Sequence, residues 1–156
     1  MSTEDNKAVL RRFAEVWNQG QVAVLDELCA PNFLFHMPSR PDVRTLEDYK
    51  RFITQFRSAC PDFHGTIDDM IAEGDKVVMR DTWHATNTGD LVTPMMRLPA
   101  TGKHVTVTAI NIGRFVEGKL VELWQEVDDR ACYNNSACCL PHNQSASDRC
   151  QPAQSR

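Results

Sequence analysis

The chain has 156 residues, of which 42% are hydrophobic and 24% are charged, and its formal net charge is −4. These values are typical of one globular domain that is large enough to bury its own core. The acidic balance and the lack of a Lys/Arg cluster argue against nucleic acid or an anionic membrane as a partner. The sequence has no apolar run of membrane-spanning length and no signal-peptide pattern, so we expect a cytoplasmic protein.

The first predicted element is an amphipathic helix. Ser2 or Thr3 can cap it, and the acidic Glu4 and Asp5 suit its first turn, where the helix dipole favours negative charge. Its apolar side chains recur at helical spacing, at Val9, Phe13, Val16 and Trp17. Gly20 is expected just beyond its last turn.

Two more helices and a short strand are predicted next. A short helix covers residues 22–29, and an apolar segment at residues 33–37 indicates a strand. Thr45 begins the third helix, with Asp48 three residues later as in a capping box. The buried stripe of this helix is apolar and mostly aromatic: Leu46, Tyr49, Phe52, Ile53 and Phe56.

After Pro61 the apolar period changes from helical to two, which indicates β-strands. The four predicted strands cover residues 63–72, 76–86, 104–115 and 120–127. Tight turns join them in pairs, so they form two hairpins, and a loop at residues 87–103 separates the hairpins. Helices followed by antiparallel strands predict an α+β layer fold.

The last part of the chain differs in composition. Residues 1–133 are predicted to form one domain, whereas residues 134–156 are polar, contain cysteines and are predicted to be disordered. No Cys-x-x-Cys pair occurs among the six cysteines, so reduced thiols are favoured over a zinc site that His142 would complete. Disulfides in the tail are the alternative if the protein is secreted. We predict no metal.

Three segments carry a resemblance to a known family. The first covers residues 6–37, and the second begins at the turn Glu73-Gly74-Asp75. The third is the most specific, and its motifs occur in this order: Thr101-Gly102-Lys103, Arg114-Phe115, Gly118-Lys119, Glu122-Leu123-Trp124 and Asp128. With these motifs the chain resembles the SnoaL-like polyketide cyclases and ester cyclases of the nuclear transport factor 2-like superfamily.

The resemblance implies a cone-shaped α+β barrel in which a curved antiparallel sheet wraps around a long helix and encloses an apolar pocket. It also implies a homodimer across the sheet. The activity that it implies is a cyclase or isomerase of secondary metabolism, which acts on a polyketide- or terpenoid-like apolar substrate without a metal or organic cofactor. Such an enzyme removes a proton next to a carbonyl and stabilises the enolate oxygen.

The resemblance also suggests site residues. The positions of the family's acid/base carboxylate and its histidine partner correspond to Gln125 and Asn111. Amides bind by hydrogen bonds but exchange no proton near neutral pH, so we assign both to substrate binding. Trp17 and Trp124 are further candidates for the lining of the pocket, with ordinary core packing as the competing interpretation.

Other ionisable residues are therefore the catalytic candidates. His36 ends the first strand and titrates in a useful range, although a partly exposed strand-end histidine is an equal alternative. Arg80 could bind a carboxylate or an enolate, or form an ion pair on the sheet surface. Asp128 follows the last strand and could lie at the mouth of the pocket. Asp81 is interpreted as a solvated residue rather than a base.

Two other classes of function compete with the cyclase. One is a non-catalytic module that binds an apolar ligand or dimerises, and the amides Asn111 and Gln125 favour it. The other is an epoxide hydrolase, which needs an arginine and an aspartate on one strand face, whereas Arg80 and Asp81 point to opposite faces. A pocket without ionisable side chains would favour the binding module. Loss of turnover on replacing His36 or Arg80 by alanine would favour the enzyme.

Overall fold

The computed structural model describes residues 2–93 and 96–128, so the predicted tail at 134–156 lies outside the described residues. The helices are α1 (Thr3–Gln19), the 3-10 helix η1 (Val22–Val24), α2 (Leu25–Leu28) and α3 (Leu46–Ala59). The strands are β1 (Cys29–His36), β2 (His64–Glu73), β3 (Lys76–Thr86), β4 (Leu91–Thr93), β5 (Met96–Leu98), β6 (His104–Val116) and β7 (Lys119–Val127). This element order confirms the predicted α+β class.

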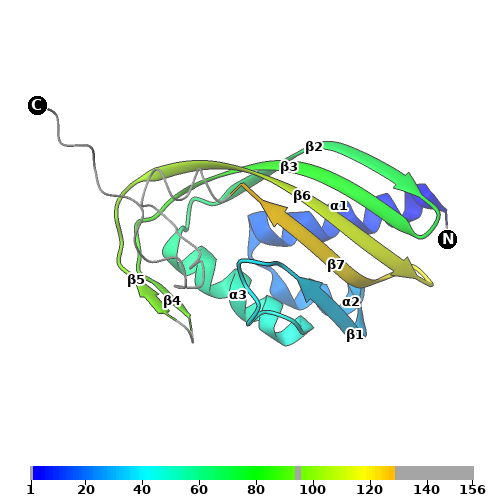
Figure 1. Cartoon of the computed structure of the whole chain (residues 1–156), viewed down its shortest axis with the longest axis horizontal. Coiled ribbons are helices and arrows are strands. Elements are labelled where there is room, and N and C mark those ends of the chain that lie inside the picture. The colour runs from blue at the N-terminus through cyan, green and yellow to red at the C-terminus, as the bar shows by residue number, and fades with distance from the viewer. Residues whose placement is uncertain (1, 94–95, 129–156) are drawn as a thin grey trace, which may run out of the picture.

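The five long strands form one curved sheet in the order β1-β7-β6-β3-β2, and the helices lie on its concave side (Figure 1). The two predicted hairpins, β2–β3 and β6–β7, are confirmed, and β3 joins them by pairing with β6. Two expectations need correction. The sheet keeps two free edges at β1 and β2 and does not close into a barrel, and β1 pairs with β7 in parallel. An alternating pattern shows which residues share a face but not in which direction a neighbouring strand runs.

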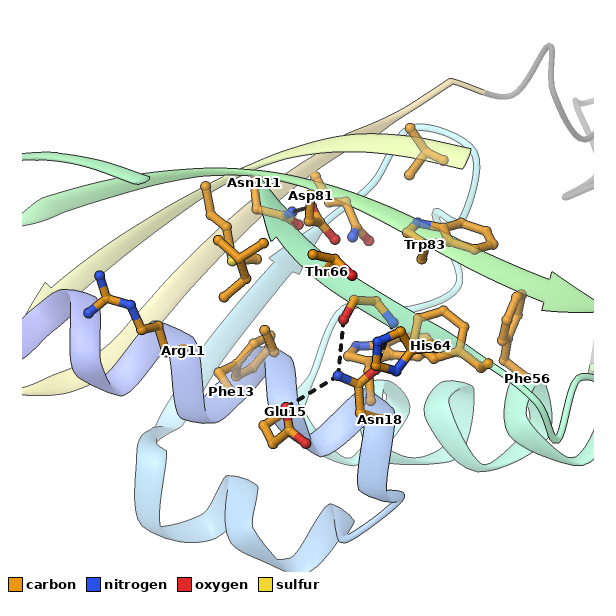
Figure 2. Close-up of a pocket in the computed structure, with 18 of the residues that line it drawn as sticks. Arg11, Phe13, Glu15, Asn18, Phe56, His64, Thr66, Asp81, Trp83 and Asn111 are labelled. Carbon is orange, nitrogen blue, oxygen red and sulfur yellow. Dashed lines mark hydrogen bonds between the residues drawn. The ribbon is translucent and has the colours of Figure 1, made fainter. Parts of the chain in front are cut away.

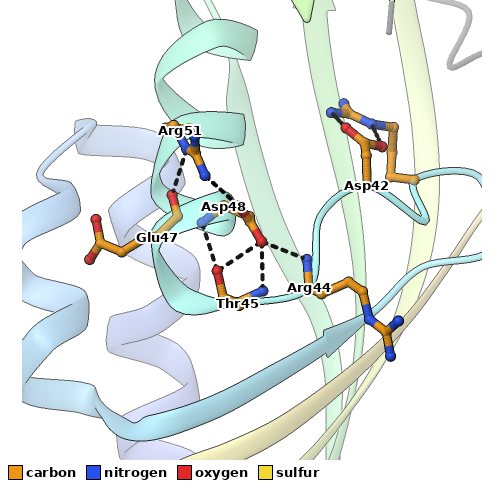
Figure 3. A network of polar contacts seen from close by, with 7 residues as sticks. Asp42, Arg44, Thr45, Glu47, Asp48 and Arg51 are labelled. Atoms are coloured by element: carbon orange, nitrogen blue, oxygen red, sulfur yellow. Dashed lines mark hydrogen bonds and ion pairs between the residues drawn. The ribbon is translucent and has the colours of Figure 1, made fainter. Parts of the chain in front are cut away.

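Both long helices begin as the sequence predicts. Ser2 caps α1 and forms a reciprocal capping box with Asp5, and Gly20 ends the helix in the left-handed conformation at φ 72°. Thr45 and Asp48 form the same box at the start of α3, where Asp48 also pairs with Arg51 (Figure 3). These caps fix where the two helices that cover the sheet begin.

Two local predictions were incomplete. The predicted short helix at 22–29 is split into η1 and α2, because a 3-10 turn precedes the α-helical turn. The predicted loop at 87–103 contains the small ribbon β4–β5. Asn87 organises this segment, because its Nδ2 donates to the Gly89 carbonyl and its Oδ1 accepts from the Thr101 N–H.

The sheet has an inner face, which packs against α1 and α3, and an outer face. Side chains alternate between them along β3 and β6. The inner face supplies buried core residues: Val77, Met79, Ala85, Val105, Val107 and Phe115. The outer face of the same strands carries exposed residues, among them Arg80, His84 and Ile110. The inner face is therefore where a site shielded from water can form.

Arg40 supports the helical side of the core from the segment between β1 and α3. Its guanidinium donates two hydrogen bonds to Asp42, at 2.9 and 2.8 Å, and lies 4.4 Å from the centre of the Phe52 ring. A buried arginine is tolerated when its charge is paired in this way. No helix in the described part of the chain is both long and apolar enough to cross a membrane.

Candidate functional site

A cavity of about 350 Å³ lies between the inner face of the sheet and the helices α1 and α3 (Figure 2). Its aromatic side chains come from both helices, from β3 and from the position just before β2: Phe13, Trp17, Tyr49, Phe52, Phe56, Phe63 and Trp83. Trp17 lies at the centre of this group, with its ring 5.3 Å from that of Phe63 and 5.4 Å from that of Phe52. A cavity of this size and lining suits a small, largely apolar molecule.

Asp81 on β3 is a half-buried ionisable side chain on the sheet side of this cavity, whereas His64 on β2 is exposed. Asn111 on β6 donates to it, with 2.6 Å between Asn111 Nδ2 and Asp81 Oδ1 (Figure 2). Desolvation by burial raises the pKa of Asp81 to about 7, the hydrogen bond from Asn111 opposes this shift, and the charge of Asp68 adds to it. The carboxyl group can therefore gain and lose a proton near neutral pH.

Asn111 and Gln125 face the cavity beside Asp81. They are directly opposite each other in the register of β6 and β7, and both line the cavity. Asn111 is buried, with 2% of its surface exposed. Asp81, Asn111 and Gln125, which we call the polar cluster, place one acid/base group and two amides against an otherwise apolar wall.

The sequence explains why Asp81 is in this position. Every second residue of β3 faces inward, and Asp81 belongs to this series with positions 77, 79, 83 and 85. Three of its neighbours in the series are buried: Val77, Met79 and Ala85. The interpretation of Asp81 as a solvated residue is therefore wrong, because its strand face is the one that the helices cover. The signal was present in the sequence as a single carboxylate in an otherwise apolar alternating series.

The open side of the cavity lies between α1 and the edge strand β2. Asn18 on α1 links the two elements, because its Oδ1 accepts from the Gly65 N–H at 2.7 Å and its Nδ2 donates to the Gly65 carbonyl at 3.1 Å. The side-chain amide takes the place of a neighbouring strand at this edge. Exposed polar side chains of Arg11, Glu15 and His64 surround this side of the cavity (Figure 2).

Three of the predicted site residues, Trp17, Asn111 and Gln125, line the cavity. Trp17 also donates from its indole Nε1 to the hydroxyl of Tyr49 at 2.8 Å. The structure therefore brings three of the four predicted binding residues together, and it adds Asp81, which was predicted to be a solvated residue.

The other four predicted site residues lie elsewhere. His36 and Trp124 are on the outer face, where their rings stack with 5.4 Å between centres, and His36 Nε2 is 2.8 Å from Glu122 Oε1. Arg80 is also on the outer face, paired with Asp68 at 3.2 Å. Asp128 is exposed beyond β7, and its backbone N–H donates to the carbonyl of Thr108. The roles assigned to these four residues stay predictions.

In the described part of the chain, no group of three or more His, Cys, Asp or Glu side chains is placed to hold a metal ion. The inner wall of the cavity combines the carboxylate and the two amides of the polar cluster with a set of rings. Its open side adds the polar side chains of Arg11, Glu15, Asn18 and His64. This arrangement can bind an apolar molecule, exchange a proton with it at Asp81, and accept or donate hydrogen bonds beside that position.

Comparisons with known proteins agree with the overall fold. The family model described as SnoaL-like polyketide cyclase matches residues 7–135. A candidate polyketide cyclase from Acidithiobacillus ferrooxidans is 31% identical over 86% of this chain and 96% of its own, with a TM-score of 0.71. TsrD from Streptomyces laurentii is 25% identical over the same shares of the two chains, with a TM-score of 0.74. No curated protein sequence matches the chain.

Proposed function

Because the chain belongs to the SnoaL-like polyketide cyclase family, we propose that it is a cofactor-independent cyclase or isomerase that uses Asp81 as its acid/base group. The family supports a cyclase or isomerase role in general, with a small molecule as substrate. The observation that carries the proposal is the carboxyl group of Asp81, desolvated in an apolar cavity and with its pKa raised to about 7. A group that titrates near the working pH is suited to both removing and returning a proton.

The proposed substrate is a polyketide- or terpenoid-like ketone with an acidic C–H next to a carbonyl. Asp81 takes this proton, and the electrons of the C–H bond form an enolate. In an isomerase the proton returns at another carbon. In a cyclase the enolate carbon attacks a second carbonyl of the same molecule, and the new alkoxide takes the proton from Asp81. The aromatic walls hold the chain folded, which supplies the proximity that ring closure needs.

Asn111 has the role of holding Asp81. Its amide N–H fixes one carboxylate oxygen, so that the other oxygen is directed to the substrate. The same hydrogen bond stabilises the ionised form and keeps the pKa of Asp81 from rising further in the desolvated cavity. Gln125 adds a neutral polar group on the adjacent strand, where it can bind a substrate oxygen.

The test is solvent deuterium exchange into β-tetralone, a bicyclic ketone with acidic C–H groups beside its carbonyl. The wild-type protein should accelerate exchange above the buffer rate, and Asp81→Asn should return it to that rate while retaining the fold. Asp81→Asn is close in shape and keeps an oxygen that can accept from Asn111, so it removes the base alone. Exchange that survives in Asp81→Asn would exclude Asp81 as the base.

A ligand-binding module without catalysis is the competing function. It predicts that β-tetralone and larger fused-ring ketones bind in the cavity but that the wild-type protein never accelerates exchange. The ionisable Asp81 on the cavity wall argues for the enzyme, because the binding module needs no such group and burying the carboxyl group costs stability.

We also propose that the protein is a homodimer through the outer face. A row of four apolar side chains crosses this face from β2 to β7. The residues are direct neighbours in the strand register, in this order: Ile71, Val78, Ile112 and Trp124. Ile71 is 63% exposed and Ile112 is 36% exposed. Contiguous exposed apolar side chains are typical of interaction surfaces.

Light scattering after size-exclusion chromatography tests this assembly. The wild-type protein should have the mass of a dimer and Ile112→Lys the mass of a monomer. The matched control is Val92→Lys on β4, which places the same charge at an exposed valine outside the five-stranded sheet. A monomeric wild-type protein would refute the proposed dimer.

A further inference from the structure

Tyr49 on α3 is a phenol buried in the wall of the same cavity. Its surface is 1% exposed, and its ring is packed 4.7 Å from the ring of Phe35 and 5.3 Å from that of Phe13. A phenylalanine would fill this space equally well, and a buried hydroxyl costs stability unless it is hydrogen bonded. The hydroxyl therefore needs an explanation that packing does not give.

Tyr49 accepts a hydrogen bond through its hydroxyl oxygen, and this bond leaves the phenolic proton available for donation. The indole N–H of Trp17 can only donate, so at 2.8 Å the Tyr49 oxygen must be the acceptor. Within residues 2–93 and 96–128, no acceptor receives the phenolic proton. Burial raises the pKa of Tyr49, and the charge of Asp81 adds to this shift, so the phenol keeps its proton at neutral pH.

Tyr49 and Asp81 belong to opposite walls of the cavity. Tyr49 comes from the helical side on α3, and Asp81 comes from the sheet side on β3. A substrate between these walls would have a proton acceptor on one side and a neutral O–H donor on the other. Proton removal next to a carbonyl needs both, because negative charge develops on the carbonyl oxygen as the C–H bond breaks.

We propose that the Tyr49 hydroxyl donates a hydrogen bond to the substrate carbonyl oxygen and stabilises the enolate that forms when Asp81 removes the neighbouring proton. This inference rests on the proposed function. In this step the C–H electron pair becomes the C=C bond, the carbonyl π pair moves to oxygen, and the proton moves to Asp81. Tyr49 keeps its proton throughout and only donates a hydrogen bond.

Trp17 is a positioning residue in this arrangement. Its N–H occupies one lone pair of the Tyr49 oxygen and so directs the phenolic proton away from the indole. A hydroxyl that accepts a hydrogen bond is also polarised into a better donor. The sequence predicts that Trp17 binds the substrate. In this proposal Trp17 also orients the Tyr49 hydroxyl.

Deuterium exchange into β-tetralone tests Tyr49→Phe, which keeps the ring and removes the hydroxyl. The exchange turnover should fall about 10²- to 10³-fold, whereas KM should change less than about threefold, because the donor acts mainly in the transition state. Trp17→Phe should cause a smaller loss. Thr106→Val, which removes a hydroxyl from the outer face, is the matched control and should leave exchange unchanged. An exchange turnover of Tyr49→Phe within twofold of the wild-type value would overturn the proposal.

A binding measurement separates this inference from the proposed function. β-Naphthol is a planar phenol whose anion resembles an enolate, and its ionised form is recognised by its absorption spectrum. The measurement uses Asp81→Asn, which has no negative charge at position 81 to repel the anion. This variant should bind the naphtholate. Adding Tyr49→Phe should weaken binding about tenfold or more and shift the bound ligand to its neutral form. No such change would overturn the role of Tyr49.

The two proposals fail in different ways. If Asp81→Asn abolishes exchange and Tyr49→Phe preserves it, Tyr49 is not the donor and the acid/base role of Asp81 stands. If the wild-type protein never accelerates exchange but the bound naphthol ionises only when Tyr49 is present, the hydroxyl is an oxyanion donor in a binding protein, and the proposed cyclase or isomerase is wrong.

Discussion

The inner and outer faces of the sheet are built from the same strands but use their polar residues differently. On the inner face, Asp81 lines a cavity that is rich in aromatic rings and is held by one amide. On the outer face, Arg80 and His36 pair with carboxylates that are partly open to water, where solvent screens the charges. A carboxylate that water does not stabilise holds its proton more tightly, so the covered face is the one on which acid/base chemistry can be built.

The strongest test of this comparison uses two adjacent residues on opposite faces. Asp81→Asn should lower exchange turnover about 10³-fold, the usual scale for a lost acid/base group. Arg80→Ala should stay within about twofold of the wild type, because its guanidinium is 54% exposed on the outer face. Steady-state exchange rates at pH 7.5 or above, with thermal melts as folding controls, measure both. A large loss for Arg80→Ala would restore the role that the sequence analysis gave it.

The second test concerns stability against pH. The pKa of Asp81 rises from 3.8 to about 7 on folding, so the folded state binds this proton more tightly than the unfolded state does. Stability should therefore fall as pH rises through this window, by roughly 4 kcal/mol from this group. We would measure the free energy of unfolding of the wild type and of Asp81→Asn by denaturant unfolding from pH 4 to 8. As the pH rises, the variant should become increasingly more stable than the wild type. A constant difference would contradict the raised pKa.

The third test changes the neighbour of Asp81. Asn111→Leu removes the donor to the carboxylate, which should raise the pKa of Asp81 above about 7. The pH at which kcat/KM rises should then increase by about one unit, with roughly fivefold less activity at pH 7. Asn111→Asp is unsuitable here because it adds a second charge. An unchanged pH profile would show that Asn111 does not control the base.

The fold was predictable from the sequence where its determinants are local. The capping boxes at Ser2 and Thr45 and the alternation along β3 and β6 are local, so the sequence alone located both long helices and both hairpins. The parallel pairing of β1 with β7 joins segments about 90 residues apart. Nothing in either segment encodes its partner, and the sequence therefore could not supply it.

The site was predictable to a similar extent. Asn111 and Gln125 were found because their strand positions match a family pattern, and the cavity confirms that they face inward. Asp81 was interpreted as solvated because strand aspartates are solvated in most contexts, although the apolar residues that alternate with it along β3 already indicated a covered face. His36 was chosen for its chemistry, but the alternation of β1 directs it to the outer face.

The fourth test returns to the outer face. His36→Ala removes the contact with Glu122 and the stacking on Trp124. Because the histidine is 36% exposed, the expected cost is less than about 1 kcal/mol, with no change in exchange activity. Urea unfolding and the exchange assay measure the two quantities. A folded His36→Ala protein without activity would revive histidine catalysis.

The smallest effect is expected for the tail. Truncation after Asn134 removes a polar segment that is poor in large apolar residues. The melting temperature should change by less than about 3 °C, equivalent to under roughly 1 kcal/mol. Differential scanning calorimetry of the full and truncated chains makes this measurement. A larger loss would mean that the tail packs on the domain.

The placement of the three tryptophans gives the protein two separate optical signals. Trp17 and Trp83 line the cavity, whereas Trp124 lies on the outer face against His36. Emission from the first two should respond to a molecule in the cavity, and quenching of Trp124 by acrylamide should respond to whatever covers the sheet. Replacing Trp124 with phenylalanine would leave emission that reports only the cavity, so ligands could be screened without labels and before any substrate is known.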